Sequence, residues 1–310
     1  MKSSKLFIYK SVLFLVLFVG CASGPKVLFK DAVDTETKPI RYQDKRTFTF
    51  TDSGVSFSNQ FEGARLNAVD QLNDSIFIVT ILPENEPINH SPYYAFDVWS
   101  SSPKEITLKF KYPEKYKHRY VPKIKSNGVW SVADSLAFQF DENFSSLKLQ
   151  TNPIAKTVSG QELHTSSIVY SWVNELIKGK ESFVRSKTIG KTKLKRPFMV
   201  LDIYKGSPKN KPVLVLLTRQ HPPEVTGYLA FQTFLSTILE ENKLTASFLE
   251  HYRILAFPLM NPDGVDLGHW RHNAGGVDTN RDWSFYHQPE IKTTVDYITQ
   301  VLKKNNSKLV

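Results

Sequence analysis

The chain has 310 residues, of which 41% are hydrophobic and 13% aromatic, so it can bury at least one complete core and is not a disordered protein. Its formal net charge is +10, but the basic residues are spread from Lys26 to Lys308, as on a solvated basic surface. Composition therefore excludes a disordered chain and gives no concentrated basic patch of the kind that binds nucleic acid.

Residues 1–20 are expected to be an export signal. Lys2, Lys5 and Lys10 accompany an apolar run over residues 12–19, which is too short to span a bilayer as a mature helix. Removing these three lysines lowers the formal charge from +10 to +7. Because export also separates the protein from nucleic acid, we expect no nucleic-acid partner.

Cys21 follows the apolar run directly and is the only cysteine, so no internal disulfide is possible. Gly20-Cys21 resembles the lipobox of bacterial lipoproteins, although Phe18 departs from the aliphatic residue preferred there. The resemblance implies lipidation at Cys21 and a membrane-anchored envelope protein, and Ala22 favours the outer membrane. The alternative is an ordinary secretory signal with an incidental cysteine.

Residues 21–45 are expected to be a tether, and residues 46–153 a β-sandwich. In the second region short runs such as "RTFTFTD", "SIFIVTIL" and "EITLKFKY" alternate apolar and polar residues between turn-forming residues. Period-two alternation indicates antiparallel strands with one buried face.

Residues 154–310 are expected to form an α/β domain. "SSIVYSWVNELIKG" predicts a helix that ends at Gly179, and "FMVLDIY", "PVLVLL" and "YRILAFPLM" predict strands. The last two are nearly continuous apolar runs, which favours a mostly parallel or mixed sheet flanked by helices. The following segments "VTGYLAFQTFLSTILEEN" and "PEIKTTVDYITQVLKKNN" predict helices. In the first of these, an apolar stripe is expected from Val225, Leu229, Phe231, Phe234, Leu235 and Ile238.

His221 and Glu224 are the first candidate site residues. They lie between a predicted strand and a predicted helix, at the edge where open α/β sheets bind ligands. Two prolines separate them and restrict the backbone, which holds the two side chains in a fixed relation. Imidazole nitrogen and carboxylate oxygen both suit Zn²⁺ at about 2.0–2.2 Å, so the pair is a candidate for two metal ligands.

Three further motifs follow "HPPE" along the chain. They are "NPDG", the Trp270-Arg271 dipeptide and "GVDTNRDW". Together with "HPPE" they resemble the zinc carboxypeptidase family over about residues 160–310. The segments "FEGARL", "YYAFDV" and "SNGVWSV" resemble, more loosely, the β-sandwich that precedes the catalytic domain in the cytosolic carboxypeptidase branch. Residues 261–263 are interpreted as structural turn residues.

The resemblance implies a metallocarboxypeptidase that removes C-terminal residues from a peptide or protein. His221 and Glu224 would be two of three protein ligands to a catalytic Zn²⁺. Arg271 would polarise the scissile carbonyl and stabilise the oxyanion, while Asn280 and Arg281 would hold the terminal carboxylate of the substrate. A planar guanidinium suits that task because it grips a carboxylate with two parallel hydrogen bonds.

Three parts of the family pattern have no counterpart in these 310 residues. They are the second zinc histidine, the tyrosine that closes over substrate and the general-base glutamate. We therefore expect an inactive front part of a longer enzyme. One alternative is an envelope lipoprotein that binds peptide or glycan and has a vestigial peptidase half. Another takes the missing ligand from His269, His272 or His287.

Overall fold

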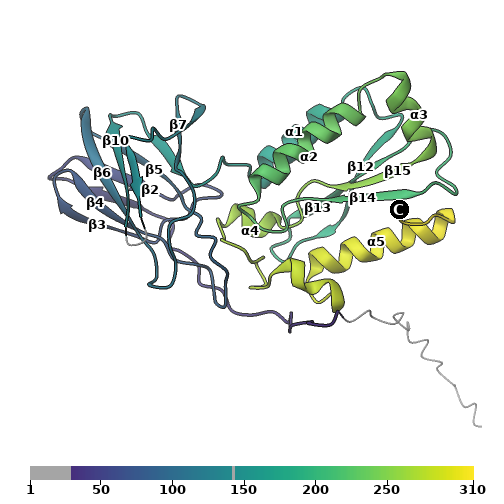
Figure 1. The fold of residues 1–310 in the computed structure, drawn as a ribbon, viewed down its shortest axis with the longest axis horizontal. Helices are drawn as coiled ribbons and strands as arrows, with labels where there is room; N and C mark the ends of the chain where they lie inside the picture. The colour runs from purple at the N-terminus through teal and green to yellow at the C-terminus, as the bar shows by residue number, and fades with distance from the viewer. Residues whose placement is uncertain (1–28, 142–143) are drawn as a thin grey trace, which may run out of the picture.

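The computed structural model describes residues 29–141 and 144–310, so the predicted signal and Cys21 lie outside the described residues. Three sheets and their connecting helices make up the described chain (Figure 1). Two of the sheets lie in the N-terminal half, and the third lies in the C-terminal half between helices. Within the described ranges, none of the helices combines the length and apolarity needed to cross a membrane.

The N-terminal half consists of a six-stranded and a five-stranded sheet. The first has the order β1 (Thr47–Phe50), β2 (Val55–Ser58), β5 (Ala95–Ser100), β11 (Lys156–Ser159), β7 (Lys123–Ser126) and β8 (Val129–Val132). The second has the order β3 (Ala68–Asn73), β4 (Ile76–Thr80), β6 (Lys104–Lys111), β10 (Ser145–Thr151) and β9 (Phe138–Phe140). Neighbouring strands are antiparallel except β4 and β6, which are parallel. β11 belongs to the first sheet although it lies beyond residue 153, where the sequence pattern predicts a boundary.

The two N-terminal sheets share one hydrophobic core. Phe57 on β2 and Phe77 on β4 are fully buried, and their ring centroids lie 5.3 Å apart. Along β6, Ile106, Leu108 and Phe110 are buried while the residues between them are more exposed. The period-two pattern of the sequence thus corresponds to one buried face in these strands.

The third sheet has the order β12 (Val184–Lys191), β13 (Pro197–Ile203), β15 (Arg253–Phe257) and β14 (Val213–Leu217). Only β14 and β15 are parallel, because β13 pairs antiparallel with both of its neighbours. Of the two alternatives that the sequence leaves open, a mostly parallel or a mixed sheet, the mixed one is confirmed. A continuous apolar run reports burial on both faces, which does not fix strand direction. A short turn at residues 192–196 joins β12 to β13 and makes that pair antiparallel.

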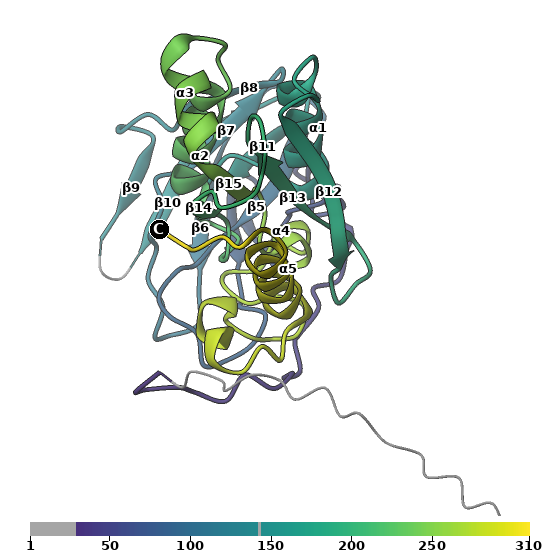
Figure 2. The ribbon, with the colours of Figure 1, turned by 90° about the vertical axis from the view of Figure 1, so that its right-hand side faces the viewer.

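Helices cover both faces of the third sheet in both views (Figures 1 and 2). One face carries α1 (Ser166–Ile177), α2 (Val225–Ile238) and α3 (Lys243–His251), and the other carries α5 (Pro289–Asn305). The short helix α4 (Pro262–Asp266) and the 3₁₀ helix η1 (Thr279–Ser284) lie in the connection between β15 and α5. α1 ends before Gly179, whose φ of +73° continues the chain in the left-handed region as the sequence predicts.

The buried stripe of α2 differs from the predicted one. Val225, Tyr228, Phe231 and Leu235 are buried, whereas Leu229 and Phe234 are 40% and 43% exposed. Successive residues of a helix are rotated by about 100°, so Leu229 and Phe234 are turned away from the buried row. Near the end of the chain, Leu309 forms a parallel bridge with Val213 of β14, the edge strand of the third sheet.

Residues 29–45 run along the C-terminal half before they enter the first sheet, as the purple segment in Figure 1 shows. The Lys38 amide donates to the Gly275 carbonyl at 2.8 Å, and Gln288 Nε2 donates to the Thr35 carbonyl at 2.8 Å. The part of the predicted tether that the structure describes is therefore docked on the loop before α5. These hydrogen bonds hold it against the C-terminal half.

Candidate active site

His221 and Glu224 lie in the connection between β14 and α2. β14 ends at Leu217, and Glu224 is the residue that precedes the first turn of α2. His221 Nδ1 lies 2.6 Å from Glu224 Oε1, with the imidazole 9% exposed and the carboxylate 51% exposed. The two candidate ligand atoms therefore converge at the rim of the third sheet.

Asp278 contacts the opposite side of the His221 ring. Its Oδ1 atom lies 2.8 Å from His221 Nε2, and its Oδ2 atom accepts a hydrogen bond from Arg271 Nε at 2.7 Å. One carboxylate thus joins the candidate metal ligand to the candidate oxyanion-stabilising arginine. Asp278 is not among the site residues predicted from the sequence, although it stands in the "GVDTNRDW" segment two residues before Asn280.

The ion pairs at the site shift the pKa values of its members. Burial lowers the pKa of His221, but hydrogen bonds to Asp278 and Glu224 outweigh burial and raise it above its ordinary value. Burial raises the pKa of Asp278, but His221 and Arg271 outweigh that effect and hold it well below its usual range. Glu224 is likewise shifted downwards overall, since its contacts with His221 outweigh its burial. Two carboxylates therefore face one imidazole and one guanidinium.

A cavity of about 560 Å³ opens in front of His221, Glu224 and Arg271. Both halves of the chain line it, because Arg119 and Tyr120 of the N-terminal half form the facing wall. The Arg119 side chain donates to the His90 carbonyl at 2.7 Å and to Ser91 Oγ at 2.9 Å, which holds that wall together.

Asn280 and Arg281 lie on η1, beside this cavity. Gln220 Nε2 donates to Asn280 Oδ1 at 3.3 Å, and Gln220 Oε1 accepts from Trp283 Nε1 at 2.9 Å, so η1 is fastened to the residue before His221. Arg281 lines a neighbouring cavity of about 310 Å³, which Arg271 and Asp278 also line. Arg281 thus lines this neighbouring cavity and not the cavity in front of His221 and Glu224, while Arg271 lines both.

Residues 261–263 begin the short helix α4 and do not form an isolated turn, and the side chains of Asn261 and Asp263 have structural partners. The Asn261 side chain accepts from the Gly264 amide at 2.9 Å and caps α4. Asp263 is fully buried and accepts from Thr192, from the Leu194 amide and from Arg196.

The fit of these residues to a zinc ion is partial. His221 and Glu224 present one nitrogen and one oxygen donor, but the described residues contain no group of three His, Cys, Asp or Glu that could hold a metal. His269 Nδ1 lies 2.9 Å from the His272 carbonyl oxygen, and His272 Nδ1 lies 3.0 Å from Glu84 Oε1. His287 Nδ1 lies 3.3 Å from Thr35 Oγ1. The three histidines considered as replacement ligands thus have other partners.

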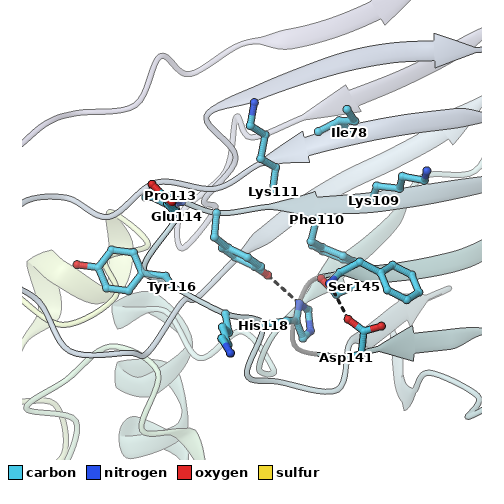
Figure 3. A pocket seen from close by; sticks show the side chains of 13 residues that line it. Ile78, Lys109, Phe110, Lys111, Pro113, Glu114, Tyr116, His118, Asp141 and Ser145 are labelled. Atoms are coloured by element: carbon cyan, nitrogen blue, oxygen red, sulfur yellow. Dashed lines mark hydrogen bonds between the residues drawn. The ribbon is translucent and has the colours of Figure 1, made fainter.

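A second large cavity, of about 590 Å³, lies in the N-terminal half beside β6 (Figure 3). Tyr112 Oη lies 2.8 Å from His118 Nδ1, and His118 Nε2 lies 2.6 Å from the Tyr120 carbonyl oxygen. Burial lowers the pKa of His118 to about 4, so this imidazole is neutral and paired on both nitrogens at neutral pH. The cavity is therefore a weaker candidate for catalysis than the one at His221.

Residues 169–307 match the family model described as zinc carboxypeptidase. The chain carries a zinc carboxypeptidase domain. Its relatives include mouse cytosolic carboxypeptidase 3, which is 22% identical over 82% of this chain and 28% of its own length. Human cytosolic carboxypeptidase 1 is 30% identical over 31% of this chain and 8% of its own length. The chain thus spans about a quarter or less of these curated relatives.

Solved carboxypeptidase structures are similar in fold to this chain, and the similar part is longer than residues 169–307. A crystal structure of a carboxypeptidase A homologue from Shewanella denitrificans has a TM-score of 0.68 and 18% identity, over 79% of this chain and 66% of that chain. A structure of a metallo-carboxypeptidase from Pseudomonas aeruginosa in complex with (2-guanidinoethylmercapto)succinic acid has a TM-score of 0.67 and 17% identity. The match covers 82% of this chain and 68% of that chain. At these identities the likeness establishes a carboxypeptidase-type fold with mixed sheets and helices.

Proposed function

We propose that the protein belongs to an enzyme that hydrolyses C-terminal peptide bonds of peptides or proteins with the help of Zn²⁺. The observation that carries this proposal is the convergence of His221 Nδ1 and Glu224 Oε1, 2.6 Å apart, in a cavity that Arg271 also lines. The family match of residues 169–307 supports the metal and the reaction class.

His221 and Glu224 would hold the zinc ion, which when bound supplies Lewis-acid activation of the carbonyl and of water. Arg271 would donate hydrogen bonds to the carbonyl oxygen as negative charge develops there, since its guanidinium is anchored by Asp278. Asn280 and Arg281 would bind the terminal carboxylate of the substrate. An internal peptide bond offers no such carboxylate, so this grip would restrict the reaction to chain ends.

The 310 residues alone would be inactive. Catalytic zinc sites normally combine three protein ligands with water, and the described residues supply two. A two-ligand site binds metal weakly.

Export and lipidation at Cys21 are part of the same proposal, and they are supported by the basic residues, the apolar run and the single cysteine of the N-terminus. Expression in a bacterial host with labelled palmitate tests them. Incorporation that disappears in Cys21→Ser supports a lipid anchor, and unlabelled protein contradicts it.

The substrate assignment is tested by calorimetric titration with (2-guanidinoethylmercapto)succinic acid at saturating Zn²⁺. Its carboxylates imitate a peptide terminus, so we expect binding that Arg281→Met weakens about tenfold or more, because a charge-assisted carboxylate contact is lost. Arg46→Met, at the start of the first sheet, is the matched control. Equal binding by all three proteins would refute the carboxylate role, and peptide binding independent of zinc would favour a binding protein with a vestigial peptidase half.

A further inference from the structure

The loop that carries Arg271 is anchored in the N-terminal half of the chain. Trp270 is fully buried within the core of the two N-terminal sheets, although it belongs to the C-terminal half in sequence. Its ring packs against Tyr116 at 5.3 Å between centroids and against Tyr112 at 6.4 Å, both edge to face. The residue immediately before Arg271 is thus fixed by residues of the other half.

Glu84, which follows β4, binds the backbone of the same loop. Its side chain is fully buried and accepts hydrogen bonds from three successive amides, those of Trp270 at 2.8 Å, Arg271 at 3.0 Å and His272 at 2.7 Å. Consecutive amides that point at one anion form a concave binding site, and hydrogen bonds to a charged acceptor are the stronger kind. Both carboxylate oxygens of Glu84 are used.

The surroundings keep Glu84 ionised. Burial alone would raise the pKa of its carboxyl, but His269, His272 and Arg65 outweigh burial and hold the pKa below its usual range. Arg65 NH2 lies 3.7 Å from Glu84 Oε2, and Arg65 Nε donates to the Gly268 carbonyl at 2.8 Å. A buried cation of the N-terminal half therefore holds the start of the same loop.

Backbone packing leaves the loop no room to shift toward the N-terminal half. Gly268 has a φ of +65°, and a Cβ atom at this position would lie 2.3 Å from the Ala64 carbonyl oxygen. Close approach of the two backbones requires glycine here.

We propose that Glu84 is a positioning residue that sets the location of Arg271 in the cleft. Two carboxylates from opposite halves of the chain fix this arginine, Glu84 at its backbone amide and Asp278 at its guanidinium. The N-terminal half is then a required part of the site. The catalytic meaning of this arrangement rests on the proposed function of Arg271, whereas the positioning itself does not.

The full chain without substitutions gives the first test, by NMR-detected hydrogen exchange. The amides of Trp270, Arg271 and His272 are expected to exchange as slowly as amides in the core strands. Exchange at the rate of exposed loop amides would overturn the proposal, and this result does not depend on whether any variant folds.

Glu84→Gln and Glu84→Ala, with Ser100→Ala as a control, give the second test. Ser100 is a buried residue of the N-terminal half whose hydroxyl bonds, among the described residues, to Ser102 and Thr151, so its loss destabilises the same half without touching the loop. The readout is the Arg271 Nε–H signal, which is assigned by its absence in Arg271→Lys. We expect its exchange to be about tenfold faster or more in the Glu84 variants, with Gln intermediate, and unchanged in Ser100→Ala.

An unchanged Arg271 Nε–H signal in folded Glu84→Gln would overturn the positioning role. A changed signal together with no zinc-dependent binding of the succinic acid ligand by the unsubstituted chain would support the positioning role and contradict the proposed function. The two ideas can therefore fail separately.

Discussion

The Nε2 atom of His221 lies 2.8 Å from Oδ1 of Asp278, on the opposite side of the imidazole from Glu224. When Nε2–H donates to this carboxylate, Nδ1 is the ring nitrogen that faces Glu224. It donates to Glu224 while it carries a proton, and its lone pair becomes available to a metal ion when that proton is lost. A neutral imidazole held in this tautomer is the form that binds a metal ion, and a carboxylate behind the ring is the usual way to fix it.

Asp278→Asn is expected to lower zinc affinity by about 10–100-fold, because outer partners of metal-ligating histidines typically contribute that much. Calorimetric zinc titration measures it. Asp134→Asn, in an exposed turn of the N-terminal half, serves as the control and should leave the affinity unchanged. Equal affinities of Asp278→Asn and the unsubstituted chain would show that this carboxylate does not support His221.

Arg253→Met is expected to destabilise the fold by about 3–5 kcal/mol, because it leaves a buried carboxylate without its main partner. Asp202 is fully buried and accepts from Arg253 Nε and NH2, both at 2.7 Å. Lys292→Met, which breaks an exposed pair with Asp296, should cost less than about 1 kcal/mol. Urea unfolding of both variants decides the matter, and similar losses would contradict the assignment of Asp202 and Arg253 to the core.

Gly268→Ala and Gly206→Ala form a matched pair, since both glycines have a φ of +65°. Nothing lies within 4 Å of a Cβ atom at Gly206, whereas one at Gly268 would lie 2.3 Å from the Ala64 carbonyl oxygen. Gly206→Ala should cost about 1–2 kcal/mol from backbone strain alone. Gly268→Ala should cost a further ~1–3 kcal/mol or more because neighbouring backbone must move. Urea unfolding that gives equal losses would contradict the close contact between the halves.

The contribution of Glu290 to the stability of the protein is expected to fall as the pH rises from about 4.5 to about 7. Burial and the nearby Asp263 raise the pKa of its carboxyl from 4.5 to about 7, despite hydrogen bonds from Asn273 and from backbone amides. The folded state thus keeps a proton that the unfolded state releases, and this contribution is present at low pH and lost on the way to pH 7.

Glu290→Gln should therefore be more stable than the unsubstituted chain at pH 8, by about 2–3 kcal/mol, and about equal to it at pH 4. Thermal or urea unfolding across this pH range measures the difference. Glu240→Gln, at an exposed position after α2, should follow the unsubstituted chain at every pH. A constant difference between Glu290→Gln and the unsubstituted chain would contradict the raised pKa.

Local patterns predicted those parts of the structure that depend on neighbouring residues. The helix before Gly179 and the convergence of His221 with Glu224 across two prolines follow from spacing and backbone restriction. Contacts between distant segments were not predictable in this way. Asp278 reaches His221 from 57 residues away and Glu84 reaches the Arg271 loop from 187 residues away, and no local periodicity records such pairs.

Strand direction and helix orientation show the same limit. The apolar run of β13 is compatible with either direction, and its antiparallel pairing depends on the polar strand β12, which carries no strong pattern of its own. Tyr228 is fully buried in α2 while Leu229 beside it is not, because tertiary packing selects the buried face from a helix that is apolar on more than one side.

Zinc titration of the unsubstituted chain, His221→Ala, Glu224→Ala and His251→Ala tests the central claim most directly. His251 lies exposed at the end of α3 and bonds to the Ser247 carbonyl, so its removal controls for adventitious binding to surface histidines. We expect weak binding at a single site, which is lost in His221→Ala and Glu224→Ala and retained in His251→Ala. Binding that survives in both His221→Ala and Glu224→Ala, or no binding by the unsubstituted chain at millimolar Zn²⁺, would contradict it.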